Sequence, residues 1–393
     1  MATVEFRNVD IVFGDNQKAA LAMLRDGATR DEVIARTHCV PGAIDVNFAV
    51  ERGSIYVLMG LSGSGKSTVL RAVNRLNRIA RGSVLVEHDG KPVDIGKCDD
   101  GTLREVRMHT VAMVFQQFAL LPWRTVRENV GFGLEVRGIP AAERNRIVDE
   151  KLALVGLSKW AEKYSHELSG GMQQRVGLAR AFATDAEILL MDEPFSALDP
   201  LIREKLQDEL LDLQKTLKKT IVFVSHDLDE ALKLGNEIAI LESGRIVQAG
   251  TAEDILLRPA DAYVAEFVKH MNPLNVLRGT SVMTPASSLR RVGTELLIDS
   301  GEMIRVKIDA EDRPVGVTLG GRTGSFASAD SETGTVPDAH RHDMIVAPVD
   351  LTLRAAIALK RQTNHPILLV DQLGRLAGLC GDDEIYRGLL RRQ

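Results

Sequence analysis

A glycine-rich segment between an apolar run and a helical run carries the strongest chemical signal in the sequence. Residues 60–67 read Gly-Leu-Ser-Gly-Ser-Gly-Lys-Ser and fit the phosphate-binding pattern GxxxxGK[ST], the P-loop. Its glycines let backbone N–H groups point inward around phosphate oxygens, and the next helix adds the positive end of its dipole. We expect Lys66 to reach the β- and γ-phosphates of ATP and Ser67 to hold Mg²⁺. The predicted nucleotide-binding positions here are Gly60, Ser62, Gly63, Ser64, Gly65, Lys66, Ser67 and Thr68.

Two adjacent carboxylates follow a second apolar run, residues 188–191. A buried strand ending in Asp192 and Glu193 would present both at the carboxyl edge of a sheet. We expect Asp192 to hold Mg²⁺, directly or through water, and Glu193 to polarise the attacking water as general base. A surface acidic turn is the alternative, and the accompanying P-loop disfavours it.

A second phosphate-binding turn lies more than 100 residues after the P-loop. Residues 168–175 read Leu-Ser-Gly-Gly-Met-Gln-Gln-Arg. Ser169 and the N–H groups of Gly170 and Gly171 would stand at a helix N-terminus, where an anion is stabilised. A capped helix start with no ligand is the alternative reading of these residues.

Together these motifs resemble the ATPases of ABC importers, over residues 3–270, because residues 168–175 match the LSGGQ-type signature with Met172 inserted before Gln173. The resemblance implies a P-loop cassette with a mostly parallel sheet and a helical signature subdomain at about 117–183. It also implies a homodimer, in which the signature turn of one subunit, Gln173 included, closes over the ATP on the P-loop of the other.

The resemblance extends to three further positions. Gln116, after the apolar run 111–115, corresponds to a glutamine that senses Mg²⁺ and the attacking water, with the neighbouring Gln117 as the alternative. Asp199 ends a Ser-Ala-Leu-Asp segment that crosses the dimer interface in the family. His226 corresponds to the histidine that contacts the γ-phosphate.

Phe13 is the candidate for the aromatic ring that stacks on adenine. It precedes Gly60 by 47 residues, and a helical insert at 16–38, broken at Gly27, accounts for that separation. Ordinary core packing is the alternative for this ring.

Residues 118–123, Phe-Ala-Leu-Leu-Pro-Trp, form an apolar loop that, by the resemblance, receives a helix of a membrane-spanning permease. An apolar, aromatic loop suits a protein partner. Local core packing remains the alternative.

Segments 20–37, 59–68, 118–123 and 270–275 together resemble the quaternary-amine branch of these importers, and most closely its choline type. Glycine betaine, proline betaine and carnitine are the alternative cargoes. In such systems an extracytoplasmic solute-binding protein and the permease recognise the cargo, so no residue here reads its identity.

Strand-like runs alternate with helical stretches through the first part of the chain, which predicts a mostly parallel sheet covered by helices, an α/β fold. The clearest expected elements are strands at 3–13, 43–50, 54–59, 111–115, 187–191 and 220–225, and helices at 66–76, 141–183 with breaks, and 201–218. We place an ATPase domain at 1–275 and a separate domain at 278–393.

The tail resembles a degenerate tandem CBS-like α+β domain. Val282–Pro285 looks like the opening of one module and 344–390 like a second, and we expect short strands and helices in both 302–318 and 344–390. The nucleotide-binding pattern of such modules ends in a hydroxyl residue and an aspartate, but Gly381 and Glu384 stand there. The first copy, 316–322, lacks both residues. The segment 320–340 reads as a loop. We expect this tail to serve dimerisation or regulation.

Composition limits the class of protein. The chain has 393 residues, 45% hydrophobic and 26% charged, with a net charge of −5, which argues against nucleic-acid binding. No apolar run is long enough to cross a bilayer, and no signal peptide is evident. Three distant cysteines predict free thiols. We expect a protein bound peripherally, through its permease, to the cytoplasmic face of the inner membrane. A transporter-independent ABC ATPase, an exporter and a regulatory module with a vestigial ATPase are the alternatives.

Overall fold

The computed structural model divides the chain into two compact units, which are described separately. The first contains residues 1–255 and 259–264, and the second 256–258 and 265–393. The residues that the structure describes are 2–196, 198–269, 272–299, 301, 303–329, 335–336 and 344–390.

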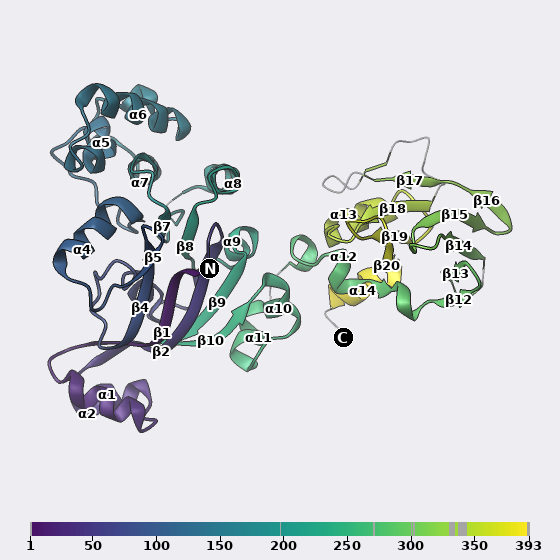
Figure 1. Cartoon of the computed structure of the whole chain (residues 1–393), viewed down its shortest axis with the longest axis horizontal. Helices are drawn as coiled ribbons and strands as arrows, with labels where there is room; N and C mark the ends of the chain where they lie inside the picture. The colour runs from purple at the N-terminus through teal and green to yellow at the C-terminus, as the bar shows by residue number, and fades with distance from the viewer. Residues whose placement is uncertain are drawn as a thin grey trace. The chain divides into compact units, whose positions relative to one another are not determined.

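A six-stranded sheet forms the centre of the first unit, and five of its strands are parallel (Figure 1). The strands lie in the order β10 (Arg245–Gly250), β9 (Glu237–Glu242), β3 (Ile55–Met59), β8 (Thr220–Val224), β7 (Ile188–Asp192) and β6 (Val111–Val114). Every residue of β3, β7 and β8 is buried, as expected for parallel strands covered on both faces. The predicted mostly parallel sheet is confirmed.

A second, antiparallel sheet packs on the first and was not predicted as a separate layer. Its strands lie in the order β2 (Val40–Glu51), β1 (Ala2–Phe13), β4 (Arg81–His88) and β5 (Lys91–Asp94). The rings of Phe6, Phe48 and Tyr56 stack between the sheets, with centroids 4.4 Å and 4.8 Å apart along the series. This aromatic column lies in the apolar core beneath the P-loop.

A helical hairpin leaves the antiparallel sheet between β1 and β2. It consists of α1 (Gln17–Arg25) and α2 (Arg30–Thr37), separated near Gly27, which has a φ of +87°. Phe13, the last residue of β1, pairs with Val40, the first residue of β2, so the two ends of the insert lie side by side in the antiparallel sheet. The predicted insert with its break is confirmed.

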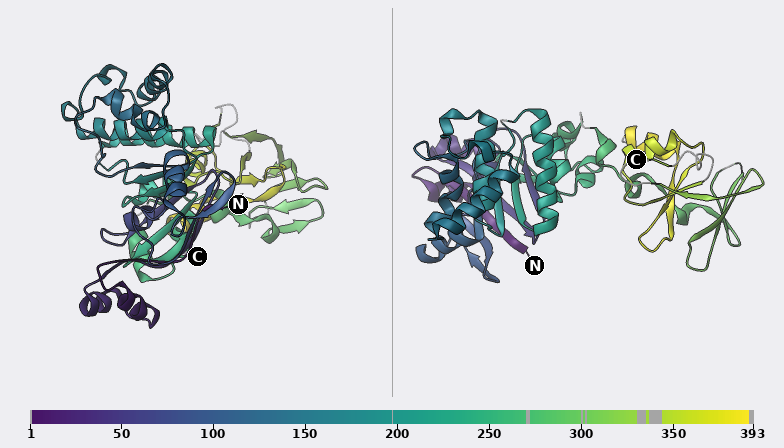
Figure 2. Two further views of the ribbon diagram at one scale, coloured as in Figure 1. Left: turned by 60° about the vertical axis from the view of Figure 1, so that its left-hand side comes forward. Right: turned by 90° about the horizontal axis from the view of Figure 1, so that it is seen from above.

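The signature lies in a helical subdomain with its own apolar core, made by α5 (Val126–Val136), α6 (Ala141–Leu154) and α7 (Gly170–Ala183). Figures 1 and 2 show these helices at one end of the first unit and the α1–α2 hairpin at the other. The other α-helices of the first unit are α3 (Lys66–Leu70), α4 (Asp100–Glu105), α8 (Pro200–Leu217) and α9 (Leu228–Leu234). The residues of α10 (Ala252–Leu257) and α11 (Ala262–Val268) are divided between the two units. Short π and 3₁₀ turns are η1 (Val106–Thr110), η2 (Ser158–Trp160) and η3 (Ser165–Glu167).

Helix α3 ends at Leu70, six residues before the predicted end at 76. Beyond it the backbone tightens into turns bonded three residues apart, and Arg75 adopts a φ of +54°. The Arg107 guanidinium donates hydrogen bonds to the carbonyls of Asn74 and Arg75. These carbonyls are therefore paired without the hydrogen bonds that a continued helix would supply.

The second unit contains two sheets. A mixed sheet has the order β11 (Thr284–Pro285), β20 (Leu376–Cys380), β19 (Ile367–Val370), β18 (Met344–Pro348) and β17 (Phe326–Ser328). An antiparallel sheet follows the chain through β12 (Arg290–Val292), β13 (Glu295–Leu297), β14 (Ile304–Ile308), β15 (Pro314–Leu319) and β16 (Arg322–Gly324). Its helices and turns are η4 (Pro273–Asn275), α12 (Gly279–Val282), η5 (Ala286–Ser288), α13 (Leu353–Lys360) and α14 (Asp382–Leu390).

The two halves of the tail differ. Residues 344–390 alternate strand, helix, strand, strand and helix, as expected for the second predicted module. The helices expected within 302–318 are wrong, because the described residues of this segment, 303–318, hold strands and turns only. The predicted loop at 320–340 is partly wrong, since β16 and β17 occupy its first half, and 330–334 and 337–340 lie outside the described residues. His270 and Met271 also lie outside them.

Among the described residues, no helix combines the length and apolar character needed to cross a membrane.

Candidate functional site

The predicted site residues follow four neighbouring parallel strands at one edge of the central sheet. In the sheet order β3-β8-β7-β6, β3 leads into the P-loop, β8 into His226, β7 into Glu193 and β6 into Gln116. Ligands of open α/β sheets bind outside such carboxyl ends. The topology therefore gathers residues that are far apart in sequence.

Two glycines of the P-loop occupy positions that a side chain cannot share. Gly60 and Gly65 have φ values of +144° and +102°. A Cβ on Gly60 would lie 2.2 Å from the Leu241 carbonyl oxygen, and one on Gly65 the same distance from that of Gly42. The loop thus packs directly against neighbouring backbone.

Lys66 is buried at the base of the loop, where its Nζ donates to the carbonyls of Gly60 (2.8 Å) and Leu61 (2.9 Å). Burial lowers the pKa of this ammonium, while the carboxylates of Glu193 and Asp192 oppose that shift. A bound phosphate would supply a closer negative charge.

Asp192 is fully buried and bonded on both carboxylate oxygens. The Ser67 hydroxyl donates to one oxygen at 2.7 Å, and the Arg71 guanidinium to the other at 2.8 Å. A buried carboxylate beside a hydroxyl supplies the oxygen ligands that Mg²⁺ prefers, and phosphate oxygens and water complete such sites. The described residues contain no cluster of three or more His, Cys, Asp or Glu side chains able to hold a metal by themselves. The residues thus fit Mg²⁺ held jointly with a nucleotide.

Glu193 lies between two of the predicted catalytic side chains. Its Oε2 accepts from Gln116 Nε2 at 3.2 Å and lies 3.2 Å from His226 Nδ1. This contact favours Gln116 over Gln117. Glu193 itself has a φ of +48°, a strained conformation for a residue with a side chain.

The backbone around Glu193 is fixed from two sides. Its N–H donates to the Val224 carbonyl on β8, and its carbonyl accepts from Gln174 Nε2 at 3.3 Å. Gln174 is almost fully buried. The sequence analysis missed both Gln174 and Arg71, because each bonds to a residue that only the folded topology brings near it.

Phe13 lies beside the start of α3. A Cβ placed on Gly42 would lie 2.7 Å from the Phe13 ring and 2.8 Å from Thr68 Cγ2, so ring and P-loop helix flank the same glycine. The Phe13 side chain is 42% exposed, which disfavours the core-packing alternative.

The signature turn begins α7. Ser169 is the N-cap, and its hydroxyl accepts from the Met172 N–H; a Cβ on Gly170 would meet open space. Gln173 bonds instead to the carbonyls of Ser165 and Leu168, which places it within the turn. In the described chain, none of these bonds reaches the P-loop of the same subunit.

Asp199 caps α8 by accepting from the Ile202 N–H. Ala197, in the same predicted interface segment, lies outside the described residues. The roles predicted for Gln173 and Asp199 at a nucleotide shared between subunits stay predictions.

The loop after Gln116 combines exposed and packed residues. Phe118 and Ala119 have positive φ values, and the Arg180 guanidinium from α7 donates to both of their carbonyls, at 2.8 Å and 2.6 Å. Leu120 packs on the helical subdomain, whereas Trp123 is 71% exposed. The core-packing alternative thus holds for Leu120 and not for Trp123.

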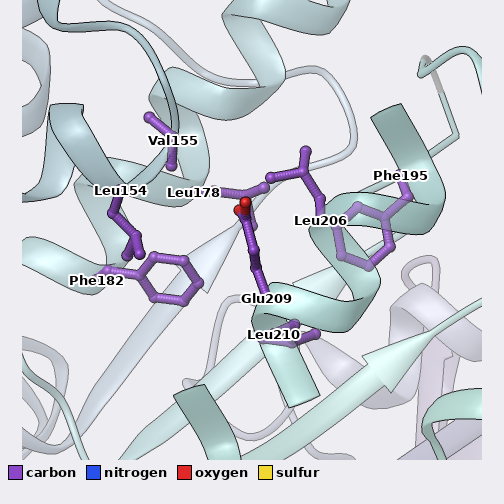
Figure 3. A pocket seen from close by; sticks show the side chains of 8 residues that line it. All are labelled: Leu154, Val155, Leu178, Phe182, Phe195, Leu206, Glu209 and Leu210. Atoms are coloured by element: carbon purple, nitrogen blue, oxygen red, sulfur yellow. The ribbon is translucent and has the colours of Figure 1, made fainter. Parts of the chain in front are cut away.

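Two pockets share the Phe195 side chain. One is polar and opens beside Glu193 and His226. The other is apolar and is drawn in Figure 3, with Glu209 as its sole polar lining residue. The residues that line it are Leu154, Val155, Leu178, Phe182, Phe195, Leu206, Glu209 and Leu210. Because seven of these eight residues are apolar and the eighth is acidic, this pocket is not suited to bind a triphosphate.

Comparison with known proteins agrees with this geometry. Residues 44–196 match the family model described as ABC transporter. The glycine betaine transport ATP-binding protein OpuAA of Bacillus subtilis (strain 168) is 40% identical over 392 residues, which cover 98% of this chain and 91% of that protein. The choline transport ATP-binding protein OpuBA of the same strain is 43% identical over 225 residues, 57% of each chain. The dimeric, post-hydrolysis structure of the ATP-binding cassette MJ0796 bound to ADP and Pi is 30% identical, with a TM-score of 0.55, and the match covers 63% of this chain and 98% of that one.

We predict that Gly65→Ala and Gly63→Ala differ in cost. A Cβ on Gly65 would overlap a backbone oxygen, whereas one on Gly63 would meet open space despite its φ of +80°. We expect Gly63→Ala to lower the free energy of unfolding by about 1 kcal/mol, and Gly65→Ala by more than about 2 kcal/mol. Urea unfolding followed by tryptophan fluorescence measures this, because both tryptophans, Trp123 and Trp160, lie in the first unit. Equal losses would contradict the packing argument.

Proposed function

Since the chain belongs to the family of ATP-binding subunits of glycine betaine and other quaternary-amine ABC importers, we propose that it hydrolyses ATP to drive uptake of a quaternary amine. Subunits of this family hydrolyse ATP in coupling to import. The observation that carries the assignment of residues is the convergence of Lys66, Asp192, Glu193 and His226 on one sheet edge.

ATP binding would exchange contacts that the free chain makes with itself. Lys66 would leave the carbonyls of Gly60 and Leu61 for the β- and γ-phosphates, and Phe13 would stack on adenine. Ser67, Asp192 and Gln116 would hold Mg²⁺, which neutralises phosphate charge when bound.

Hydrolysis requires a base positioned toward the γ-phosphorus. Glu193, held between Gln116 and His226, would accept a proton from the attacking water, and His226 would contact the γ-phosphate. Positioning and electrostatics supply the rate, because no covalent intermediate is needed.

We infer that the working unit is a homodimer. Ser169 caps the helix that begins at Gly170, and a Cβ on Gly170 would meet open space, which suits an approaching γ-phosphate bound to a partner subunit. The cassette MJ0796, one of the similar solved structures, is dimeric with ADP and Pi bound. Closure would place each ATP between the P-loop of one chain and the signature turn of the other.

The membrane contact is assigned to the loop 118–123. Its exposed Trp123 offers an aromatic anchor for a permease helix, and Gln116 lies two residues before the loop. The chain would therefore lie at the cytoplasmic face of the membrane, held by permease subunits that receive cargo from a solute-binding protein.

We assign the cargo to the class of quaternary amines because similar proteins are transport subunits for such amines. The match to the glycine betaine protein spans nearly the whole chain, whereas the match to the choline protein spans 57% of it. Choline is the amine proposed from the sequence resemblance, and glycine betaine is the nearest alternative.

We propose that residues 278–393 form a regulatory or dimerisation domain of degenerate CBS type that binds no nucleotide. Glu384, at the position of the ribose-binding aspartate, is buried and already bonded. It accepts from the Thr284 hydroxyl and, at 2.8 Å, from the Gly381 N–H. Its carboxylate thus ties β11 to the start of α14.

Glu193→Gln is expected to retain ATP and lose turnover, because an amide keeps the shape of the side chain and cannot accept the proton. Steady-state ATPase activity should fall by at least about 100-fold, while ATP affinity stays within about twofold. The exposed Glu143→Gln in α6 is the matched control, with activity unchanged. Hydrolysis near the wild-type rate in Glu193→Gln would overturn the base assignment.

Uptake in cells tests the cargo. Cells of the source organism carrying Lys66→Ala in place of the wild type should lose accumulation of radiolabelled choline or glycine betaine, and competition between the two amines ranks them. Unchanged uptake of both amines, together with normal expression of the variant, would contradict the proposed cargo class.

Calorimetric titration with ADP and AMP tests the tail. One nucleotide should bind per wild-type chain, and none to Lys66→Ala, because the P-loop is the proposed single site. A residual site in Lys66→Ala that weakens further on Glu384→Ala would show that the tail does bind nucleotide.

A further inference from the structure

The α1–α2 hairpin touches the P-loop through one side chain. Arg30, the first residue of α2, donates from Nη1 to the Gly63 carbonyl oxygen at 3.2 Å. The two residues are 33 positions apart in sequence, so the contact joins the insert to the apex of the loop. Arg30 is partly buried, and its Nε is enclosed without a hydrogen-bond partner in the described chain.

The start of α2 holds Arg30 in a fixed position. Thr29 and Glu32 form a reciprocal capping box at the start of α2, in which each side chain bonds the backbone N–H of the other residue. One turn on, Val33 is fully buried in an apolar cluster that anchors the hairpin to β1 and β2. The guanidinium is thus held by a capped, anchored helix rather than by a free loop.

The Arg30 bond acts on a tightly turned part of the P-loop backbone. Gly63 has a φ of +80°, and the next N–H, that of Ser64, donates to the Leu61 carbonyl. The Arg30 bond to the Gly63 carbonyl restrains the plane of the Gly63–Ser64 peptide, and with it the turn that the Ser64 N–H closes on the Leu61 carbonyl. The shape of this turn sets how the backbone N–H groups of the loop are presented, and in a P-loop such groups are the phosphate ligands.

We propose that Arg30 is a positioning residue for nucleotide binding, which holds the P-loop apex in its phosphate-binding form and adds a positive charge beside the triphosphate. This inference rests on the proposed ATPase function and assigns a role in that site to the helical insert. The insert would then contribute to the nucleotide site through Arg30, at the start of its second helix, while Phe13 contributes from the end of β1, just before the insert.

Nucleotide titration of the full-length chain tests the role of Arg30. Arg30→Ala should raise the Kd for fluorescently labelled ADP about tenfold, the effect of losing one hydrogen bond from a charged donor. Arg30→Lys, which keeps the charge and a donor, should recover most of this loss. In the ATPase assay the change should appear in KM, with kcat within about twofold, because Arg30 contacts neither Glu193 nor His226 in the structure.

Arg36→Ala is the matched control, since Arg36 lies on the same helix and is exposed. It should bind ADP as the wild type does. Wild-type affinity in Arg30→Ala, an equal loss in Arg36→Ala, or a loss confined to kcat would overturn the proposal. A wild-type chain that binds no ADP would instead refute the proposed ATPase function, so the two failures are distinguishable.

Discussion

The pairing of four parallel strands in the order β3-β8-β7-β6 is the constraint on which the site depends. Strand spacing of roughly 5 Å sets the distances between whatever follows each strand. A shift in the register of β7 against β8 would move Asp192 and Glu193 together along the strand direction, away from Ser67 and His226. The fully buried faces of these strands oppose such a shift, because slipping a strand exposes or displaces its packed side chains.

In the structure each buried charged group of the site bonds to other groups of the same chain. Lys66 bonds to carbonyls of its own loop, and Asp192 bonds to Ser67 and Arg71. Removing the Arg71 guanidinium would leave the buried Asp192 carboxylate without an opposite charge, which costs far more free energy of folding than the loss of a surface hydrogen bond. Nucleotide and Mg²⁺ would compete with these contacts, and the net gain in binding would be the difference between the two sets.

The sequence allowed the prediction of features with a local chemical signature. The P-loop, the strand ending in Asp192 and the insert with its break at Gly27 all follow from residue types at fixed spacing. Arg71, Gln174 and Arg30 escaped prediction because their partners lie 121, 19 and 33 residues away, and only the folded topology brings each pair together. The prediction of helices in 302–318 was wrong for a different reason. The short apolar runs of this segment suit a strand and a helix equally, and pairing with neighbouring strands in the fold made them strands.

The loop after Gln116 joins three parts of the cassette by direct contact. Gln116 contacts Glu193, Trp123 stands exposed, and Arg180 ties the carbonyls between them to α7, the helix that begins at the signature turn. A displacement of this loop by a protein bound at Trp123 would pull on both the general base and the signature helix, since the Phe118 and Ala119 backbone is strained and held by one guanidinium. Through this link, a protein bound at Trp123 would act on both the Glu193 side chain and the helix that begins at the signature turn.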